Sequence, residues 1–329
     1  MTEKTINKPG VIAVMQYDHG LAFEYSIGVE DIIREVSINR DSVFDIASVS
    51  KQFTAFSILL LEQQGLLELN DLLSRYVPEA AAFEADITLE HLIYHTSGLP
   101  CLFEIAEEKG IDYFSDFSKE NILKGVLEKT SVYFTPGTKY QYSNTGYMFL
   151  AQVVEHISGL TFSEFIKKEI FDPLGMRHSF VSDGLNKEQK AVTGYQKFNN
   201  TFYSIFSPWG VVGAGLVHSS VTDLLKWGRN FLSGSLGGQR LLNKMLTPLP
   251  SLTDAGIVIE DHCSYCFGLE LEKEDFGDVY CHAGSTFGRE SYFLRSQEEG
   301  FTLVVLSNIE DYDVSGIAEQ LLHSRVRDK

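Results

Sequence analysis

The chain has 329 residues, of which 44% are apolar and 22% are charged, a balance typical of a globular protein. Its 27 basic and 45 acidic side chains give a net charge of −18, which repels phosphate backbones, so we expect no nucleic acid partner. No apolar run is long enough to span a bilayer. The polar start lacks the layout of a secretion signal, so we expect a cytoplasmic protein, or a secreted one whose signal has been removed.

The N-terminal segment predicts a β-hairpin followed by a helix. Apolar, strand-like runs at 10–17 and 21–27 flank Asp18-His19-Gly20, which is a turn signal. Apolar residues then recur at helical spacing over 52–64, and Gly65 is suited to end that helix.

Helix signals dominate from about residue 70 to residue 260. Thr88 can cap one helix, and the run 145–158 predicts another. Thr161 with Glu164 forms a capping-box pattern that opens the next helix, and 220–232 is a further candidate.

Strand character returns near the C-terminus. Short β-type runs at 267–271, 279–282, 291–294 and 301–306 precede an amphipathic helix over 314–323. We therefore assign the fold class α/β (α+β), with an antiparallel sheet formed by both chain termini, flanked by helices, and a mainly helical inserted lobe. The corresponding domains are 1–75 with 262–329 for the sheet, and 76–261 for the helical insertion.

Ser48 and Lys51 form a Ser-x-x-Lys pair, which places a hydroxyl and an amine one helical turn apart on one face. If Ser48 opens the helix, its hydroxyl lies at the positive end of the helix dipole. Lys51 can accept the serine proton once burial or other cations lower its pKa. The pair predicts a nucleophile and its base, against the alternative of a helix cap beside an exposed lysine.

Two later segments offer the remaining parts of an acyl-transfer site. Tyr142 and Asn144 can present a phenol and an amide to one cleft, although Asn144 could instead cap the following helix. A neighbouring ammonium would lower the pKa of the Tyr142 phenol enough for proton transfer. In the strand segment 282–285, Gly284 allows close approach of a substrate and the N–H of Ser285 can polarise a carbonyl.

The chain resembles the serine β-lactamase and penicillin-binding-protein-like hydrolases, and within them the class C branch. That branch includes D-alanyl-D-alanine carboxypeptidases, D-aminopeptidases and carboxylesterases. The resemblance runs from about Pro9 to Asn308 and rests on six segments in the family's order. They are 44–55 around Ser-x-x-Lys, His95-Thr96-Ser97-Gly98-Leu99-Pro100, Tyr142-Ser143-Asn144, Asp172-Pro173-Leu174-Gly175-Met176, Gly213-Ala214-Gly215-Leu216 with Asp223-Leu224, and His282-Ala283-Gly284.

The resemblance implies a role for each of the central residues. Ser48 would be acylated, and Lys51 and Tyr142 would share the general-base and general-acid work. Asn144 would bind the substrate or Lys51. The backbone N–H groups of Ser48 and Ser285 would form the oxyanion hole. The family uses no metal, and we expect no cofactor.

The third catalytic segment departs from the Lys-Thr-Gly pattern of the superfamily, because His282-Ala283-Gly284 stands in its place. By the resemblance, His282 and Gly284 bind the substrate together with Ser285. A lysine would supply fixed charge to a substrate carboxylate, whereas a histidine does so only when protonated, with an ordinary pKa of about 6.5. Efficient β-lactam hydrolysis is therefore less expected, and binding through His282 should weaken as the pH rises. A half-buried structural histidine is the alternative.

The predicted function is a serine hydrolase that forms an acyl-enzyme on an ester or a peptide-like amide, which is a small-molecule substrate. One alternative within the same chemistry is a low-efficiency β-lactamase or penicillin-binding protein. Another, from a different class, is a non-catalytic scaffold that binds a ligand or partner. The sequence leaves the natural substrate and the oligomeric state open.

Other residues with the chemistry of ligands are expected to be structural. Cys263 and Cys266 have metal-like spacing but no matching second pair, and Cys281 should point away from its neighbour His282 across the strand. His91 and His95 lie four residues apart, without the glutamate of a metalloprotease motif, and are expected to pack a turn.

The aromatic residues at 202–209 and the acidic side chains can both be explained without a functional role. An aromatic group could line a cleft or belong to the core, and the core is the default expectation. Its members are Phe202, Tyr203, Phe206 and Trp209. The acidic side chains are expected to form a solvated surface.

Overall fold

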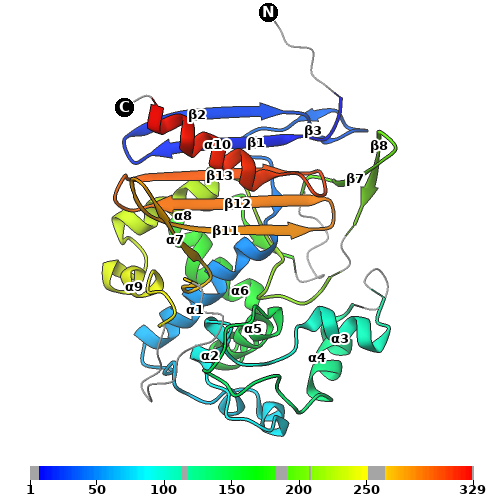
Figure 1. The fold of residues 1–329 in the computed structure, drawn as a ribbon, viewed down its shortest axis with the longest axis vertical. Helices are drawn as coiled ribbons and strands as arrows, with labels where there is room; N and C mark the ends of the chain where they lie inside the picture. Colours follow the sequence, from blue (N-terminus) through cyan, green and yellow to red (C-terminus); the bar gives the residue numbers. More distant parts are fainter. Residues whose placement is uncertain (1–6, 113–116, 183–190, 207–208, 251–263, 328–329) are drawn as a thin grey trace, which may run out of the picture.

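The computed structural model describes residues 7–112, 117–182, 191–206, 209–250 and 264–327. A six-stranded sheet lies at one end of the molecule and a mainly helical region at the other (Figure 1). Within the described part of the chain, no helix is long and apolar enough to cross a membrane.

The sheet is antiparallel, with the strand order β10-β11-β12-β13-β1-β2. Its strands are β1 (Val11–Tyr17), β2 (Gly20–Ile27), β10 (Glu270–Glu274), β11 (Gly277–Thr286), β12 (Arg289–Ser296) and β13 (Phe301–Ser307). β1 pairs with β13, so the two ends of the chain share one sheet, as expected. The α/β (α+β) class is therefore confirmed. The division into domains at residues 75 and 262 stays a prediction.

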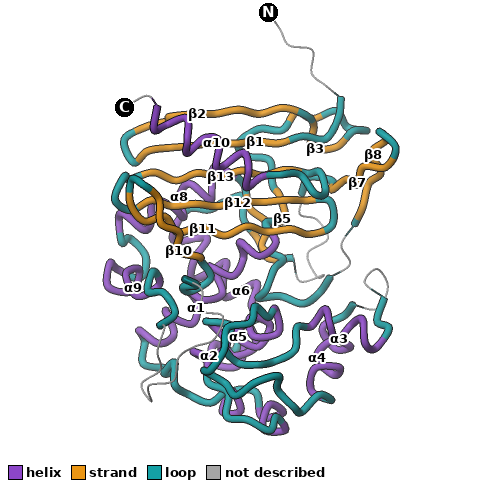
Figure 2. The backbone as a smooth tube through the Cα atoms, in the orientation of Figure 1, coloured by secondary structure: helices purple, strands orange, loops and turns teal. Residues whose placement is uncertain are grey.

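Seven short strands of the described chain lie outside the six-stranded sheet. They are β3 (Val29–Asp31), β4 (Val36–Ser37), β5 (Phe44–Asp45), β6 (Phe180–Val181), β7 (Gly194–Phe198), β8 (Thr201–Ile205) and β9 (Val217–Ser219). Of these, β3, β5, β7 and β8 are labelled in Figure 2. β5, β9 and β6 form a small three-stranded sheet, and β5 leads directly into the segment that carries Ser48.

The helices follow most of the start and stop signals in the sequence. They are α1 (Lys51–Gln63), α2 (Leu89–Ile93), α3 (Leu102–Lys109), α4 (Lys119–Leu127), α5 (Asn144–Ser158), α6 (Phe162–Ile166), α7 (Asp172–Leu174), α8 (Val221–Ser233), α9 (Gly238–Met245) and α10 (Val314–Arg327). The Thr88 cap and the Thr161 capping box are both present, and Gly159 ends α5 in the left-handed conformation.

Two hydrophobic clusters lie on opposite faces of the sheet. The larger one holds α1, α8 and the inner face of the sheet, whereas α10 covers the outer face through Val314, Ala318 and Leu322. α8 packs so closely on β13 that a Cβ atom at Gly228 would lie 2.2 Å from Thr302 Oγ1. This close approach requires glycine at that position.

Candidate active site

Ser48 lies in a 3₁₀ turn, Ala47–Ser50, and α1 begins three residues later at Lys51. Ser48 therefore lies before α1 and does not open it, so the condition set for its place at the positive end of the helix dipole is not met. The reason is Ala47, whose φ of +46° is left-handed and bends the chain sharply before the nucleophile. The buried Asp45 carboxylate holds this bend by accepting the Ala47 N–H at 2.9 Å.

Lys51 is fully buried, and its Nζ lies 2.9 Å from Ser48 Oγ. The same nitrogen donates to Asn144 Oδ1 and to the Ala214 carbonyl oxygen, both at 2.8 Å. Burial lowers the pKa of Lys51 to about 7. A neutral amine has two N–H bonds, and these two oxygens can accept both. Its lone pair is then left to face the Ser48 hydroxyl, as a general base requires.

Tyr142 approaches the same hydroxyl from another side, with its Oη 3.0 Å from Ser48 Oγ. The expectation that an ammonium lowers its pKa is wrong, because burial raises the pKa of the Tyr142 phenol far above its usual value. The Lys51 amine lies 4.9 Å from the centre of the tyrosine ring, over its face. Tyr142 therefore stays protonated and can donate a hydrogen bond or a proton.

Asn144 is the first residue of α5, whereas Ser143 occupies the cap position. The Asn144 side chain accepts the Lys51 hydrogen bond, and its amide nitrogen lies 3.5 Å from Cys101 Sγ. Of its two possible roles, the structure favours holding Lys51 over capping the helix.

His282 cannot supply the charge suggested for it. Its side chain is 4% exposed, and burial together with nearby Lys51 lowers its pKa to about 3. In the neutral ring, Nδ1 donates to the Ala283 carbonyl oxygen at 2.5 Å, so Nε2 accepts from the Tyr265 hydroxyl at 3.2 Å. The expectation that substrate binding through His282 weakens as the pH rises through neutrality is therefore wrong, because the ring is already neutral across that range.

Gly284 brings β11 against the turn that carries Ser48. β10 pairs with β11 only as far as Cys281, so among the described strands residues 282–286 form an open edge. A Cβ atom at Gly284 would lie 2.6 Å from the Ile46 carbonyl oxygen and 2.9 Å from Ser48 N. The strand edge and the nucleophile turn are thus in backbone contact.

Replacing Gly284 with alanine is expected to lower turnover of a working ester substrate by about 10- to 100-fold. The added methyl group forces the strand and the Ser48 turn apart, and small misplacements at a reacting centre are costly. Steady-state kinetics on a p-nitrophenyl ester measures this. Gly20→Ala in β2 is the matched control, because it makes the same change at a glycine where an added Cβ atom would meet nothing within 4 Å. Unchanged kcat in Gly284→Ala would contradict the importance of this contact.

Ser48, Tyr142, Asn144, His282, Gly284 and Ser285 all line one cleft of about 440 Å³. The Ser285 hydroxyl points to the carboxylate of Glu290 on the neighbouring strand, donating to Oε1 at 2.9 Å. The structure thus brings every predicted site residue to this cleft, with Lys51 buried behind Ser48.

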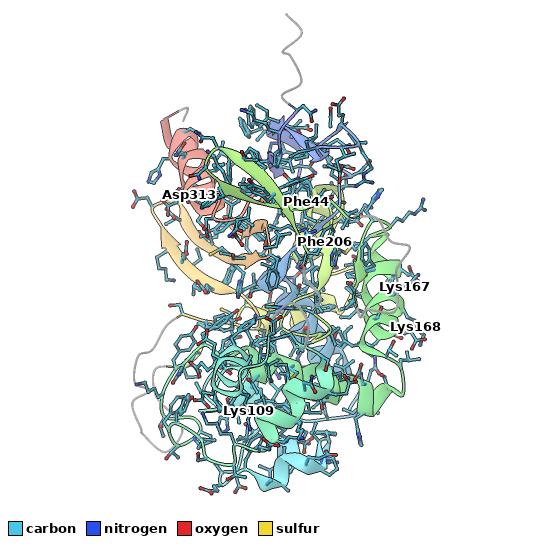
Figure 3. The ribbon with its side chains drawn as sticks, turned by 90° about the vertical axis from the view of Figure 1, so that its right-hand side faces the viewer. Phe44, Lys109, Lys167, Lys168, Phe206 and Asp313 are labelled. Atoms are coloured by element: carbon cyan, nitrogen blue, oxygen red, sulfur yellow. The ribbon has the colours of Figure 1, made fainter. Side chains whose placement is uncertain are left out.

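The sequence missed the acidic character of the cleft. Four carboxylates line it, those of Asp45, Glu270, Glu290 and Asp313, and among the described residues no lysine or arginine does. Figure 3 shows Asp313 beside α10, at the sheet end of the molecule. Burial raises the pKa of Glu290 to about 7. The expectation that acidic residues merely coat the surface is wrong here, because β12 is covered on both faces and Glu290 is only 8% exposed.

An aromatic wall closes another side of the cleft. Phe103, Phe117 and Trp209 line it, and the Trp209 ring centre lies 4.8 Å and 4.9 Å from those of the two phenylalanines. Trp209 packs against the main core and also lines the cleft, so the default expectation of a core position holds for it in part. The expectation is wrong for Tyr203 and Phe206, which are 55% and 68% exposed (Phe206 is labelled in Figure 3). Among the described strands, β8 pairs only with β7.

The remaining candidate ligands are structural where they are described. His91 Nδ1 accepts the Thr88 N–H, and His95 Nδ1 accepts the Ser143 N–H. Cys281 packs under α10, on the face opposite His282, as expected. Cys263 lies outside the described residues, and elsewhere in the described chain no cluster of three metal-ligating side chains occurs.

The family model described as Beta-lactamase matches residues 2–324. A penicillin-binding protein of Bacillus subtilis (strain 168) is 27% identical over 307 residues, covering 88% of this chain and 66% of the relative. A D-aminopeptidase of Gluconobacter oxydans (strain 621H) is 25% identical over 304 residues, covering 91% and 55%. The chain thus spans less than two thirds of the length of these curated relatives.

Among solved structures, a penicillin-binding protein from Bacillus halodurans superposes with a TM-score of 0.81 at 25% identity. The match covers 94% of this chain and 95% of that structure. The arrangement of sheet and helices is therefore shared along nearly the whole of both chains.

Proposed function

The chain belongs to the β-lactamase family, and on that premise we propose that it is a serine hydrolase that forms an acyl-enzyme on Ser48. The observation that carries the proposal is the approach of two groups to one hydroxyl. Lys51 Nζ lies at 2.9 Å and Tyr142 Oη at 3.0 Å from Ser48 Oγ. This is the reach that proton transfer to and from a nucleophile requires.

The proposed acylation begins as Ser48 Oγ attacks the substrate carbonyl carbon while its proton passes to the neutral Lys51 amine. The carbonyl oxygen becomes negative and is stabilised by the backbone N–H groups of Ser48 and Ser285. Tyr142 passes a proton to the leaving group, and Lys51 returns its proton to the phenol. Water, deprotonated by the same groups, then hydrolyses the acyl-enzyme and frees Ser48.

The proposed substrates are esters and peptide-like amides, in keeping with the similarity to a penicillin-binding protein and a D-aminopeptidase. Hydrolysis of a carboxylate-bearing β-lactam is the weaker alternative, because His282 is neutral and the described lining of the cleft offers no lysine or arginine. A non-catalytic scaffold would have no need of a buried lysine held by two oxygens against a serine.

Labelling with a fluorophosphonate tests the proposal. We expect the intact mass to rise by one adduct, and peptide mapping to locate that adduct on Ser48, because the activated hydroxyl attacks phosphorus as it attacks a carbonyl. A panel of p-nitrophenyl esters, D-alanyl peptides and nitrocefin then ranks the substrate classes. A folded protein that gains no adduct would favour the scaffold, and rapid turnover of nitrocefin would favour the β-lactamase alternative.

A further inference from the structure

Glu290 is a buried carboxylate at the edge of the cleft without a cationic partner. Its Oε1 accepts both the Ser285 hydroxyl at 2.9 Å and the Asp311 N–H at 3.1 Å. Within the described residues no donor reaches Oε2, and no basic side chain forms an ion pair with Glu290. Two donors therefore fix the orientation of the carboxylate while its second oxygen is left for a ligand.

This carboxylate stands close to the reacting centre. Ser285, whose hydroxyl it accepts, directly follows Gly284, and a Cβ atom at Gly284 would lie 2.9 Å from Ser48 N. Asp313 lines the same end of the cleft, at the start of α10. A negative potential therefore acts on any substrate whose carbonyl reaches Ser48.

We propose that Glu290 binds a positively charged amine of the substrate through Oε2. The proposal rests on the proposed hydrolase function and narrows its substrates to esters and amides that carry a free ammonium group close to the scissile carbonyl. An ammonium is the ligand that a carboxylate with one open oxygen accepts most strongly, as a charge-assisted hydrogen bond. It would also offset the cost of burying the Glu290 charge.

The aromatic wall indicates the second feature of the substrate. Phe103, Phe117 and Trp209 present stacked and tilted rings to the cleft, and aromatic surfaces of this kind favour a large apolar or aromatic group. Phenylalanine derivatives combine such a group with an amine beside the carbonyl, which makes them suitable probes.

The experiment compares phenylalanine p-nitroanilide with its N-acetyl derivative, using both enantiomers of each. For the wild-type protein we expect kcat/KM to be about 10- to 100-fold higher for the free amine, the range of a hydrogen bond to a charged group. In Glu290→Gln this ratio should fall to within about threefold of one. In Glu319→Gln, the same change at an exposed position on α10, the ratio should stay at the wild-type value.

A binding measurement with the unaltered protein covers the case in which Glu290→Gln fails to fold. 2-Phenylethylamine should inhibit ester hydrolysis at least tenfold more strongly than 2-phenylethanol, because only the amine is charged. Equal inhibition, or a ratio that survives Glu290→Gln in a folded protein, overturns the proposal. Either result would coexist with phosphonate labelling of Ser48, so it is distinct from failure of the hydrolase function.

Discussion

Ser48→Ala should abolish hydrolysis of every ester or amide that the wild-type protein turns over, with a loss of at least about 10⁴-fold in kcat. The variant lacks the oxygen that both Lys51 Nζ and Tyr142 Oη approach within 3.0 Å. No covalent intermediate can then form, and phosphonate labelling should disappear as well. Initial rates with a p-nitrophenyl ester and intact-mass spectrometry measure the two effects.

Ser50→Ala is the matched control, since it makes the same change two residues away in the same motif. The Ser50 hydroxyl is buried and accepts the Val217 N–H at 3.1 Å, so its loss should cost stability, about 1–3 kcal/mol. Turnover per folded molecule should remain close to the wild-type rate. Substantial activity in a Ser48→Ala protein purified free of contaminating esterases would remove Ser48 from the mechanism.

Lys51→Met should lower kcat/KM by about 10²- to 10⁴-fold, the usual contribution of a general base. Methionine fills a similar volume but offers no lone pair to the Ser48 proton. In the wild-type protein the neutral amine is the active form, and its pKa is lowered to about 7. The rate should therefore rise with pH from 5 to about 7 and level off above it. The variant should be slow and lack this rise.

The same substitution should stabilise the fold. The folded-state pKa of Lys51 lies below its ordinary value of 10.5, so the unfolded chain binds more protons between about pH 7 and pH 10.5. Stability therefore falls as the pH drops through that window, and removing the amine should raise the free energy of unfolding at pH 7 by about 0.5–2 kcal/mol. Urea denaturation at pH 7 and pH 9 tests the sign.

Lys273→Met on the exposed face of β10 serves as the control for Lys51→Met, because it removes one positive charge far from the amine of Lys51. It should leave both the rate and its pH profile unchanged. A Lys51→Met protein with nearly normal turnover would show that another group takes the serine proton.

Local signals in the sequence predicted local structure well. The hairpin at Asp18-His19-Gly20, the caps at Thr88 and Thr161, and the helix end at Gly159 depend on residues a few positions apart, and all are present. The contact between Tyr142 and Ser48, by contrast, could not be predicted from local signals. The two residues are 94 positions apart, and only the resemblance to a family placed them together.

Burial was the property that the sequence could not supply. All eight residues of β12 are buried, so no alternation marks Glu290 as unusual. The charge of His282 depends on Tyr265 and Lys51, which pack around it from other parts of the chain. Likewise, the position of Trp209 at the cleft depends on ring contacts with Phe103 of α3 and with Phe117, which precedes α4.

The pairing of β1 with β13 has a consequence for synthesis of the protein on the ribosome. Val11 cannot pair until Ser307, its partner across the sheet, has been synthesised. The turn that carries Ser48 likewise cannot pack on β11 until Gly284 has been synthesised. A nascent chain therefore keeps the other edge of β1, opposite β2, unpaired for most of its translation, and the proposed active site cannot assemble until the last strands emerge. Chaperone binding to the hairpin of β1 and β2 during translation, and inactivity of every fragment that stops short of β13, follow from that order of events.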